Sequence, residues 1–183
     1  MQLMKHTKLT VIILTAVMIM FSLFSCTNPN KLDLNTYKNS EPNTMLVDYY
    51  DRVVGTPMEQ PYEELALYTH SDTQALLERY TNGGTEDEVR ERYLVPLQAA
   101  QDAFDAIRES GMDKWNSRNS GMIAICGRSC VCKFPDGEGG YVRVTSEHMP
   151  EDGAKAFAKV SAALAAYATD ENKSEYLKQH PEQ

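Results

Sequence analysis

The fold class predicted from this sequence depends on three short runs, Met122-Ile-Ala-Ile-Cys126, Cys130-Val-Cys-Lys-Phe134 and Tyr141-Val-Arg-Val-Thr145. Each run is rich in residues that favour strands, and Gly-containing turns separate them. In the last run, Val142 and Val144 alternate with the other side chains, as the two faces of a half-buried strand require. The three runs therefore predict a small antiparallel meander.

The segments before this meander carry helical signals. Residues 59–68 have apolar side chains on one side, which predicts a short helix. Ser71 and Gln74 fit a capping box that begins a second helix, and Asn82-Gly83-Gly84 is a typical helix end. Residues 45–54 fit either a helix or a strand, and we favour the helix.

A longer amphipathic stripe follows. Its members are three or four residues apart, the spacing of one face of a helix, and they are Val89, Tyr93, Leu97, Ala100, Phe104 and Ile107. Pro96 lies inside the stripe and should kink the helix or split it in two, because proline removes a backbone hydrogen bond. A last helix is expected from about residue 150 to residue 169.

Together these elements predict an α+β fold with one core. It has a helical N-terminal half, the three-stranded antiparallel meander and a C-terminal helix. The globular domain is expected to span residues 45–170, and the polar residues 171–183 are expected to form a frayed tail.

The composition is that of one ordinary domain. The chain has 183 residues, 42% of them hydrophobic and 24% charged, and a formal net charge of −8. These values exclude a disordered chain, a collagen-like repeat and a polytopic membrane protein. The negative charge argues against a nucleic-acid partner, because binding to phosphates needs a basic face.

The first 26 residues differ from the rest. Lys5 and Lys8 precede an apolar run from Leu9 to Ser25, and no acidic residue occurs before Asp33. A basic start followed by a short apolar run is typical of a secretory signal peptide. The run is at the short limit for a permanent transmembrane helix, which needs about 20 apolar residues.

The end of this run, Leu23-Phe24-Ser25-Cys26, resembles the lipobox of bacterial lipoproteins. The resemblance implies that residues 1–25 are a cleaved signal peptide. It also implies that Cys26 carries a thioether-linked diacylglycerol and an N-acyl chain, and no other cofactor is expected. Two or more acyl chains hold a protein stably at a membrane. An uncleaved anchor helix with an incidental cysteine is the alternative.

The lipobox resemblance also indicates a location in the cell envelope. Thr27 follows Cys26, in place of the Asp associated with inner-membrane retention, and no acidic cluster that resembles a surface-export signal follows. We therefore expect the periplasmic face of the outer membrane. Removal of the leader, with Lys5 and Lys8, changes the net charge from −8 to −10. Such an acidic domain favours basic partners, although solubility alone also accounts for the charge.

Residues 26–44 are expected to form a lipidated, flexible tether. The segment after Cys26 is rich in Asn and contains two prolines, a composition typical of an unstructured spacer. As a flexible coil it would average about 25 Å from end to end. Leu32 and Leu34 alternate with polar residues, so part of the segment could instead add a short edge strand.

Three cysteines remain in the mature domain, and an odd number leaves one sulfur over in an oxidising compartment. Cys130 and Cys132 in one strand would be at or beyond the distance limit for a disulfide. A three-residue loop at residues 127–129 would set Cys126 opposite Cys130, and we favour that pair. Buried, reduced thiols are the alternative.

The same cysteines and His148 also offer a metal site or a catalytic site. Three sulfurs and one nitrogen suit Zn²⁺ or Cu⁺, but the C-x₃-C-x-C spacing lacks the usual C-x₂-C knuckle, so no metal is expected. A thiol nucleophile at Cys130 or Cys132 would need His148 or His70 as its base. The sequence carries no nucleophile motif or phosphate-binding loop that we recognise.

These observations predict a membrane-anchored envelope lipoprotein that acts as a non-catalytic binding or accessory module, or as an inhibitor, for another envelope protein. The alternative is a small periplasmic enzyme, or a metal-binding protein, that uses Cys126, Cys130 and Cys132 with His148. Ten tyrosines fit a core role, and an aromatic groove for a sugar, a peptide or a partner protein is the other interpretation.

Overall fold

A computed structural model gives the architecture, and it describes residues 32–38, 40–54, 63–82, 86–115, 127–146 and 153–181. In chain order the described elements are η1 (Leu34–Thr36), β1 (Met45–Val54), β2 (Glu63–Thr69), β3 (Gln74–Thr81), β4 (Val89–Pro96), α2 (Gln98–Glu109), η2 (Met112–Lys114), β5 (Gly127–Pro135), β6 (Tyr141–Thr145), α3 (Gly153–Ala165) and α4 (Asp170–Gln179).

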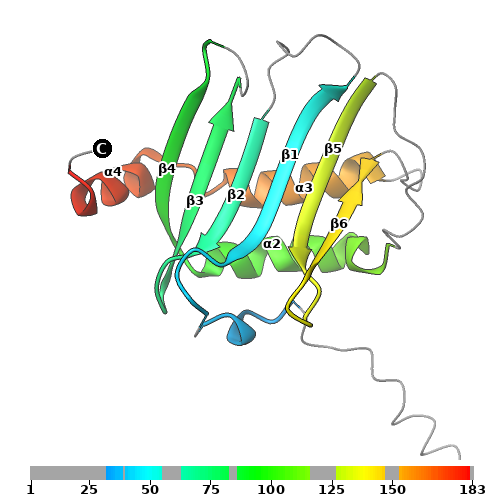
Figure 1. Cartoon of the computed structure of the whole chain (residues 1–183), viewed down its shortest axis with the longest axis horizontal. Helices are drawn as coiled ribbons and strands as arrows, with labels where there is room; N and C mark the ends of the chain where they lie inside the picture. The colour runs from blue at the N-terminus through cyan, green and yellow to red at the C-terminus, as the bar shows by residue number, and fades with distance from the viewer. Residues whose placement is uncertain are drawn as a thin grey trace, which may run out of the picture.

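One antiparallel sheet holds six strands in the order β4-β3-β2-β1-β5-β6. The first four strands pair in chain order, and β5 then pairs with the other side of β1. Helices α2 and α3 lie across one face of this sheet, behind it in Figure 1, and α4 lies beside the edge strand β4.

The hydrophobic core lies between the sheet, α2 and α3. Buried side chains that point from the sheet into this core are Val47, Tyr49, Leu65, Leu67, Ala75, Leu77, Tyr93, Val95, Cys132, Phe134 and Val144. From the helices, Phe104 and Ile107 of α2 and Phe157, Val160 and Leu164 of α3 meet them. Burial of each large side chain stabilises the fold by about 1.5–3 kcal/mol.

The helical N-terminal half expected from the sequence is wrong, because strands β1, β2 and β3 occupy it. In β1, Val47 and Tyr49 face the core, whereas Asp48 and Tyr50 point to the opposite face. Tyrosine and leucine side chains on that opposite face make both sides of the strands look apolar. The period of two that marks a strand is therefore hidden in the sequence.

Ser71 caps a turn and not the expected helix. Its Oγ accepts a hydrogen bond from the backbone N–H of Gln74 at 3.1 Å, which is the bond expected of a capping box. The backbone N–H of Ser71, however, donates to the carbonyl of Gln74, so the segment closes the hairpin between β2 and β3. Serine makes the same local bond in turns as at helix starts.

The amphipathic stripe changes its secondary structure at Pro96. Strand β4 ends at Pro96, and α2 begins only at Gln98. Tyr93 faces the core from the strand, while Phe104 and Ile107 face it from the helix. Pro96 is tolerated there because it is the last residue of an edge strand.

The expected three-stranded meander is also wrong. Residues 130–134 and 141–145 do form a hairpin, but this hairpin is one edge of the six-stranded sheet. Residues 122–126, the expected third strand, lie outside the described residues. Gly127 to Ser129 belong to β5 and pair with β1, so they do not form the loop that would set Cys126 opposite Cys130.

The ordered domain extends beyond the expected residues 45–170 at both ends. Leu32 is 2% exposed within the core, and Nη1 of Arg108 donates to its carbonyl at 2.8 Å. Residues 32–38 and 40–44 of the expected flexible tether therefore belong to the folded domain. At the other end, the expected frayed tail contains α4, and Oγ1 of Thr169 accepts from the N–H of Asn172 at 3.3 Å to cap it. The helix expected near residues 150–169 corresponds to α3.

Candidate functional site

The candidate site is the face of the sheet opposite α2 and α3, which we call the open face. In Figure 1 it looks toward the viewer, and no described helix crosses it in front of β1, β2, β5 and β6. Strand register places these side chains on it: Asp48, Tyr50, Glu64, Ala66, Tyr68, Leu76, Glu78, Tyr80, Arg90, Arg92, Leu94, Val131, Lys133, Tyr141, Arg143 and Thr145.

Charges on the open face follow rows that cross the strands. One row runs through residues directly opposite each other, in the order Arg92, Glu78, Ala66, Asp48, Lys133 and Arg143. The next row contains Arg90, Tyr80, Glu64 and Tyr50. Carboxylates thus occupy the middle strands, and cations occupy the strands on either side.

On the β4 side, the cations are engaged with neighbours on β3. Nε of Arg92 bonds to Oε1 of Glu78 at 2.7 Å, and the hydroxyl of Tyr80 donates to the other oxygen of Glu78 at 3.0 Å. The guanidinium of Arg90 lies over the ring of Tyr80, 4.8 Å from its centroid. Such a cation–π contact contributes about 0.5–1 kcal/mol at an exposed site.

The β5–β6 side repeats this arrangement. Nζ of Lys133 bonds to Oδ2 of Asp48 at 2.6 Å and lies 5.5 Å from the ring centroid of Tyr50. Arg143 donates to the hydroxyl of Tyr50 at 3.0 Å. On each side, therefore, a tyrosine ring is in contact with a cation and a carboxylate is paired with one. Arg90 and Arg92 make these two contacts on the β4 side, and Lys133 makes both on the other side.

Four side chains surround Ala66 at the middle of the open face, and we call them the acidic centre: Asp48, Glu64, Tyr68 and Glu78. Asp48 and Glu78 stand opposite Ala66 on the neighbouring strands, and Glu64 and Tyr68 are two residues away along β2. In the part of the chain that the structure describes, Glu64 and the hydroxyl of Tyr68 make no hydrogen bond or ion pair, and Oδ1 of Asp48 is buried without a hydrogen bond.

The electrostatics of the acidic centre follow from this crowding. Burial, followed by the charge of Asp48, raises the pKa of Glu64. Burial raises the pKa of Tyr68 to about 12, with further contributions from Glu78, Asp48 and Glu64. Perturbed groups of this kind gather at functional sites more often than elsewhere, although structural networks also produce them.

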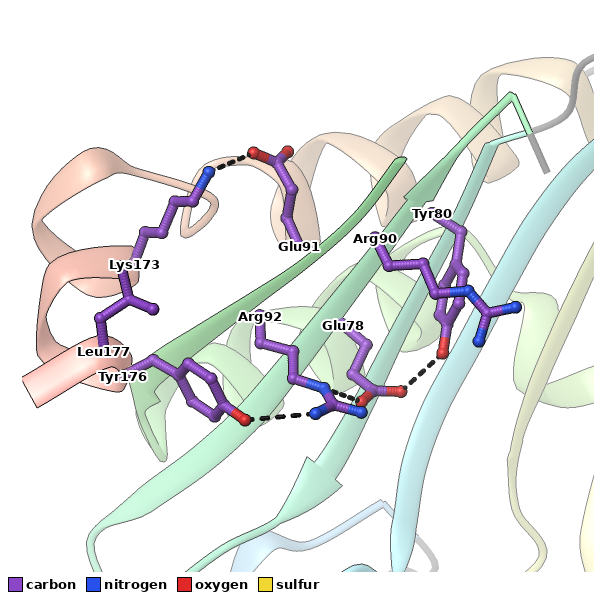
Figure 2. A pocket seen from close by; sticks show the side chains of 8 residues that line it. All are labelled: Glu78, Tyr80, Arg90, Glu91, Arg92, Lys173, Tyr176 and Leu177. Atoms are coloured by element: carbon purple, nitrogen blue, oxygen red, sulfur yellow. Dashed lines mark hydrogen bonds and ion pairs between the residues drawn. The ribbon is translucent and has the colours of Figure 1, made fainter. Parts of the chain in front are cut away.

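A hollow of about 350 Å³ lies between the open face and α4 (Figure 2), lined by Glu78, Tyr80, Arg90, Glu91, Arg92, Lys173, Tyr176 and Leu177. Nη1 of Arg92 donates to the hydroxyl of Tyr176 at 3.3 Å, so one arginine joins the helix to Glu78. A second hollow of about 490 Å³ adjoins it and includes His70 and His180. The ring of His180 stacks on that of Tyr176 at 4.3 Å.

Lys173 fixes α4 to the edge strand. Its Nζ lies 2.7 Å from Oε1 of Glu91, and the hydroxyl of Tyr93 donates to the other oxygen at 2.9 Å. The hydrogen bonds from Lys173 and then Tyr93 lower the pKa of Glu91. Figure 2 shows this pair on the other side of the β4 ribbon from Glu78 and Tyr80.

The cysteines predicted as candidate site residues do not gather at the open face. Cys130 and Cys132 lie in β5 on the side that faces the core, and the hydroxyl of Tyr49 contacts Sγ of Cys130 at 3.9 Å. Cys132 is fully buried, and burial raises the pKa of its thiol. A protonated, inaccessible thiol is a poor nucleophile. Cys26, Cys126 and His148 lie outside the described residues.

Among the described residues, no three His, Cys, Asp or Glu side chains are arranged to hold a metal ion. The described helices are likewise too short or too polar to cross a membrane. No protein-family model and no curated protein sequence matches the chain.

Sequence reasoning missed the open face because it assigned most tyrosines to the core. Tyr49 and Tyr93 are indeed in the core, but Tyr50, Tyr68 and Tyr80 lie on the open face. The signal that could have found them is a partial alternation. In each of two segments a glutamate and a tyrosine at even positions lie an even number of residues apart and are flanked by leucines at odd positions: Glu64 and Tyr68 with Leu65 and Leu67, and Glu78 and Tyr80 with Leu77.

Proposed function

We propose that this protein is a lipid-anchored, non-catalytic binding module of the bacterial envelope and that its open face binds another envelope protein. The observation that carries the proposal is the arrangement of tyrosines between charged side chains on a sheet face that no described helix crosses in front of β1, β2, β5 and β6. Tyrosine and arginine are enriched where protein interfaces derive most of their binding energy.

The chemistry at the middle of the open face favours a partner that presents basic groups there, although the described residues of the open face as a whole carry three carboxylates and four cations. The middle of this face is acidic, and the chain as a whole carries a net charge of −8. Complementary charge guides partners together and selects among them. The cations at the two sides of the face would meet acidic or polar groups of the same partner.

The proposed anchor is Cys26, with residues 1–25 removed as a signal peptide and the domain on the periplasmic face of the outer membrane. The lipobox resemblance supports it. Because Leu32 is buried in the core, only residues 27–31 lie between the proposed anchor and the core. Five residues span about 20 Å at most, so the domain would stay close to the lipid surface.

The alternative of a thiol enzyme or metal site receives less support. It would need Cys126, Cys130 or Cys132 with His148, and Cys132 is buried in the core. Of these four residues the structure describes Cys130 and Cys132, and neither lies on the open face.

Site-specific photo-cross-linking in the producing bacterium tests the binding proposal. A photoreactive residue replaces exposed Arg143 on the open face or, as a control, exposed Ala162 on α3. We expect one protein adduct from position 143 and none from position 162, and the captured protein should bind the purified full chain at equilibrium. Equal adducts from both positions, or no binding by the captured protein, would overturn the proposal.

The Cys26→Ser variant tests the anchor. We expect the wild-type chain to fractionate with membranes, with a mass that corresponds to a lipidated chain beginning at Cys26. The variant should be released from the membrane. An unmodified Cys26 in the membrane fraction would contradict lipid anchoring while leaving the open-face proposal standing.

A further inference from the structure

We infer that the acidic centre is a binding site for one cationic side chain, a lysine or an arginine, presented by the partner. This inference rests on the proposed function for the source of the cation. It adds the position and the chemistry of the contact, which the proposed function leaves open.

The first support is the buried, unpartnered oxygen of Asp48. Its side chain is 8% exposed, and one oxygen bonds to Lys133 while Oδ1 is buried without a hydrogen bond among the described residues. A buried acceptor that lacks a donor is unfavourable, and this effect is larger for a charged group. Asp48 raises the pKa of both Glu64 and Tyr68, so its charge lies beside both of them in the acidic centre.

The second support is the charge balance of the centre. It holds three carboxylates, of which Asp48 is paired with Lys133 and Glu78 with Arg92. Glu64 is half-buried and has no ion pair in the described part of the chain. Burial and then the charge of Asp48 raise its pKa and outweigh the charges of Lys133 and Arg90, which lower it. One added cation in direct contact would therefore pair with the remaining carboxylate and supply a donor.

The third support is a recurring pattern, the contact of a cation with a tyrosine ring, which occurs at two tyrosines of the open face and is lacking at Tyr68 in the part of the chain that the structure describes. Arg90 lies over Tyr80 on one side, and Lys133 lies over Tyr50 on the other. Tyr68 stands among the same carboxylates, and no cation lies over its ring in the described residues. An alkylammonium or guanidinium group on Tyr68 would complete the pattern, because aromatic faces attract organic cations.

An organic cation fits these groups better than a metal ion. The described residues offer no three carboxylate, imidazole or thiolate side chains arranged around a common point for a metal. A side-chain ammonium needs only one or two acceptors and an aromatic face. Oδ1 of Asp48, the carboxylate of Glu64 and the ring of Tyr68 are groups of these kinds.

A titration of the lipidated full chain in detergent micelles tests the inference. The probe is Nα-acetyl-lysine methylamide, and the neutral Nα-acetyl-norleucine methylamide is its matched control. NMR signals of the Tyr68 ring and of the Glu64 carboxyl carbon report binding and the pKa of Glu64. We expect the lysine probe to shift both signals with saturation and to lower that pKa, and we expect the norleucine probe to do neither.

Two variants separate a binding role from a structural one. Glu64→Gln keeps the shape of the side chain and should weaken the lysine probe about tenfold or more, since a hydrogen bond to a charged group is lost. Asp72→Asn removes one exposed carboxylate from the β2–β3 turn and should leave binding unchanged. Both variants should remain folded, as shown by their amide spectra.

Three results would overturn the inference. They are an absence of saturation with the lysine probe, equal shifts from the norleucine probe, or saturation with Ca²⁺ alone. Because this titration does not use the partner, its failure is distinguishable from failure of the proposed function. Open-face cross-links without lysine binding would support the binding module and contradict the cationic contact. Lysine binding without open-face cross-links would support the cationic contact and contradict the binding module.

Discussion

Glu64 connects the proposed site to stability. Burial and Asp48 raise its pKa above the ordinary value of 4.5, so the folded state binds this proton more tightly than the unfolded state does. This difference stabilises the fold fully below the pKa that Glu64 has in the unfolded state. The stabilisation is lost as the pH rises through the raised pKa that Glu64 has in the folded state. At neutral pH the unpaired carboxylate therefore weakens the fold.

We predict that Glu64→Gln increases the free energy of unfolding at about pH 7 and that this gain disappears below about pH 4. Urea denaturation of the two proteins at both pH values measures it. Asp72→Asn also removes one negative charge, but at an exposed position, and should give no comparable gain in the free energy of unfolding. A loss of stability at pH 7 in Glu64→Gln would show that Glu64 has a stabilising partner. A variant that is more stable yet binds the lysine probe less tightly would mark Glu64 as a residue kept for binding.

Leu32 tests the order of the segment before β1. Its side chain is 2% exposed, so Leu32→Ala should lower the free energy of unfolding by about 2–5 kcal/mol, the usual range for a buried leucine. Leu177→Ala, at a position that is 44% exposed, should change it by less than about 0.5 kcal/mol. Chemical denaturation measures both. Equal, small effects would place Leu32 outside the core.

At the scale of elements, α4 protects the edge of the sheet. It packs beside β4 through the contacts of Lys173 with Glu91 and of Tyr176 with Arg92. Unprotected edge strands pair with other chains because their backbone groups lack partners. A chain that ends at Ala168 should therefore self-associate more than the full chain as its concentration rises. Light scattering across a dilution series measures this, and an unchanged mass at every concentration would contradict the role of α4.

Some elements were predictable from the sequence because their signal is local. The stripe that ends in Phe104 and Ile107 gave the core face of α2, and Phe157, Val160 and Leu164 gave that of α3. The alternation at Val142 and Val144 gave β6. Each of these elements buries one face, and the side chains at the regular spacing of that face are apolar.

The strands of the N-terminal half were not predictable in this way. Tyr50, Tyr68 and Leu76 lie on the open face, so apolar side chains appear on both sides of β1, β2 and β3. Ser71 and Gln74 make the bond expected at a helix start, but inside a hairpin turn. The features that misled the fold prediction are thus the side chains of the proposed site and the turn beside it.

The candidate site was less predictable than the fold because it exists only through strand pairing. Asp48, Glu64 and Glu78 are separated by 14 residues or more in the chain, and register brings them around Ala66. The cysteines attracted attention because they are close in sequence, yet β5 turns Cys132 into the core. Nearness in sequence along a strand does not bring side chains together as pairing across strands does.

At the scale of the whole molecule, the fold separates the N-terminal end, where the proposed anchor lies, from the proposed binding face. The N-terminal segment meets the sheet where β1 begins, with the ring of Tyr37 against Phe104 and close to Asp136 in the β5–β6 turn. The open face lies along the side of the sheet, away from α2 and α3. A short tether from the proposed anchor at Cys26 would keep this face close to the membrane, where another anchored protein can reach it.

Carboxyl footprinting of the full chain in the membranes of its own cell tests this view most directly. A carbodiimide with a small amine labels accessible carboxylates, and mass spectrometry compares the chain in membranes with the purified chain. We predict that Glu64 is labelled less in membranes than in the purified chain. Glu109, whose side chain is 64% exposed at the end of α2, should be labelled equally in both. Equal labelling of Glu64 in the two states would contradict a partner on the open face.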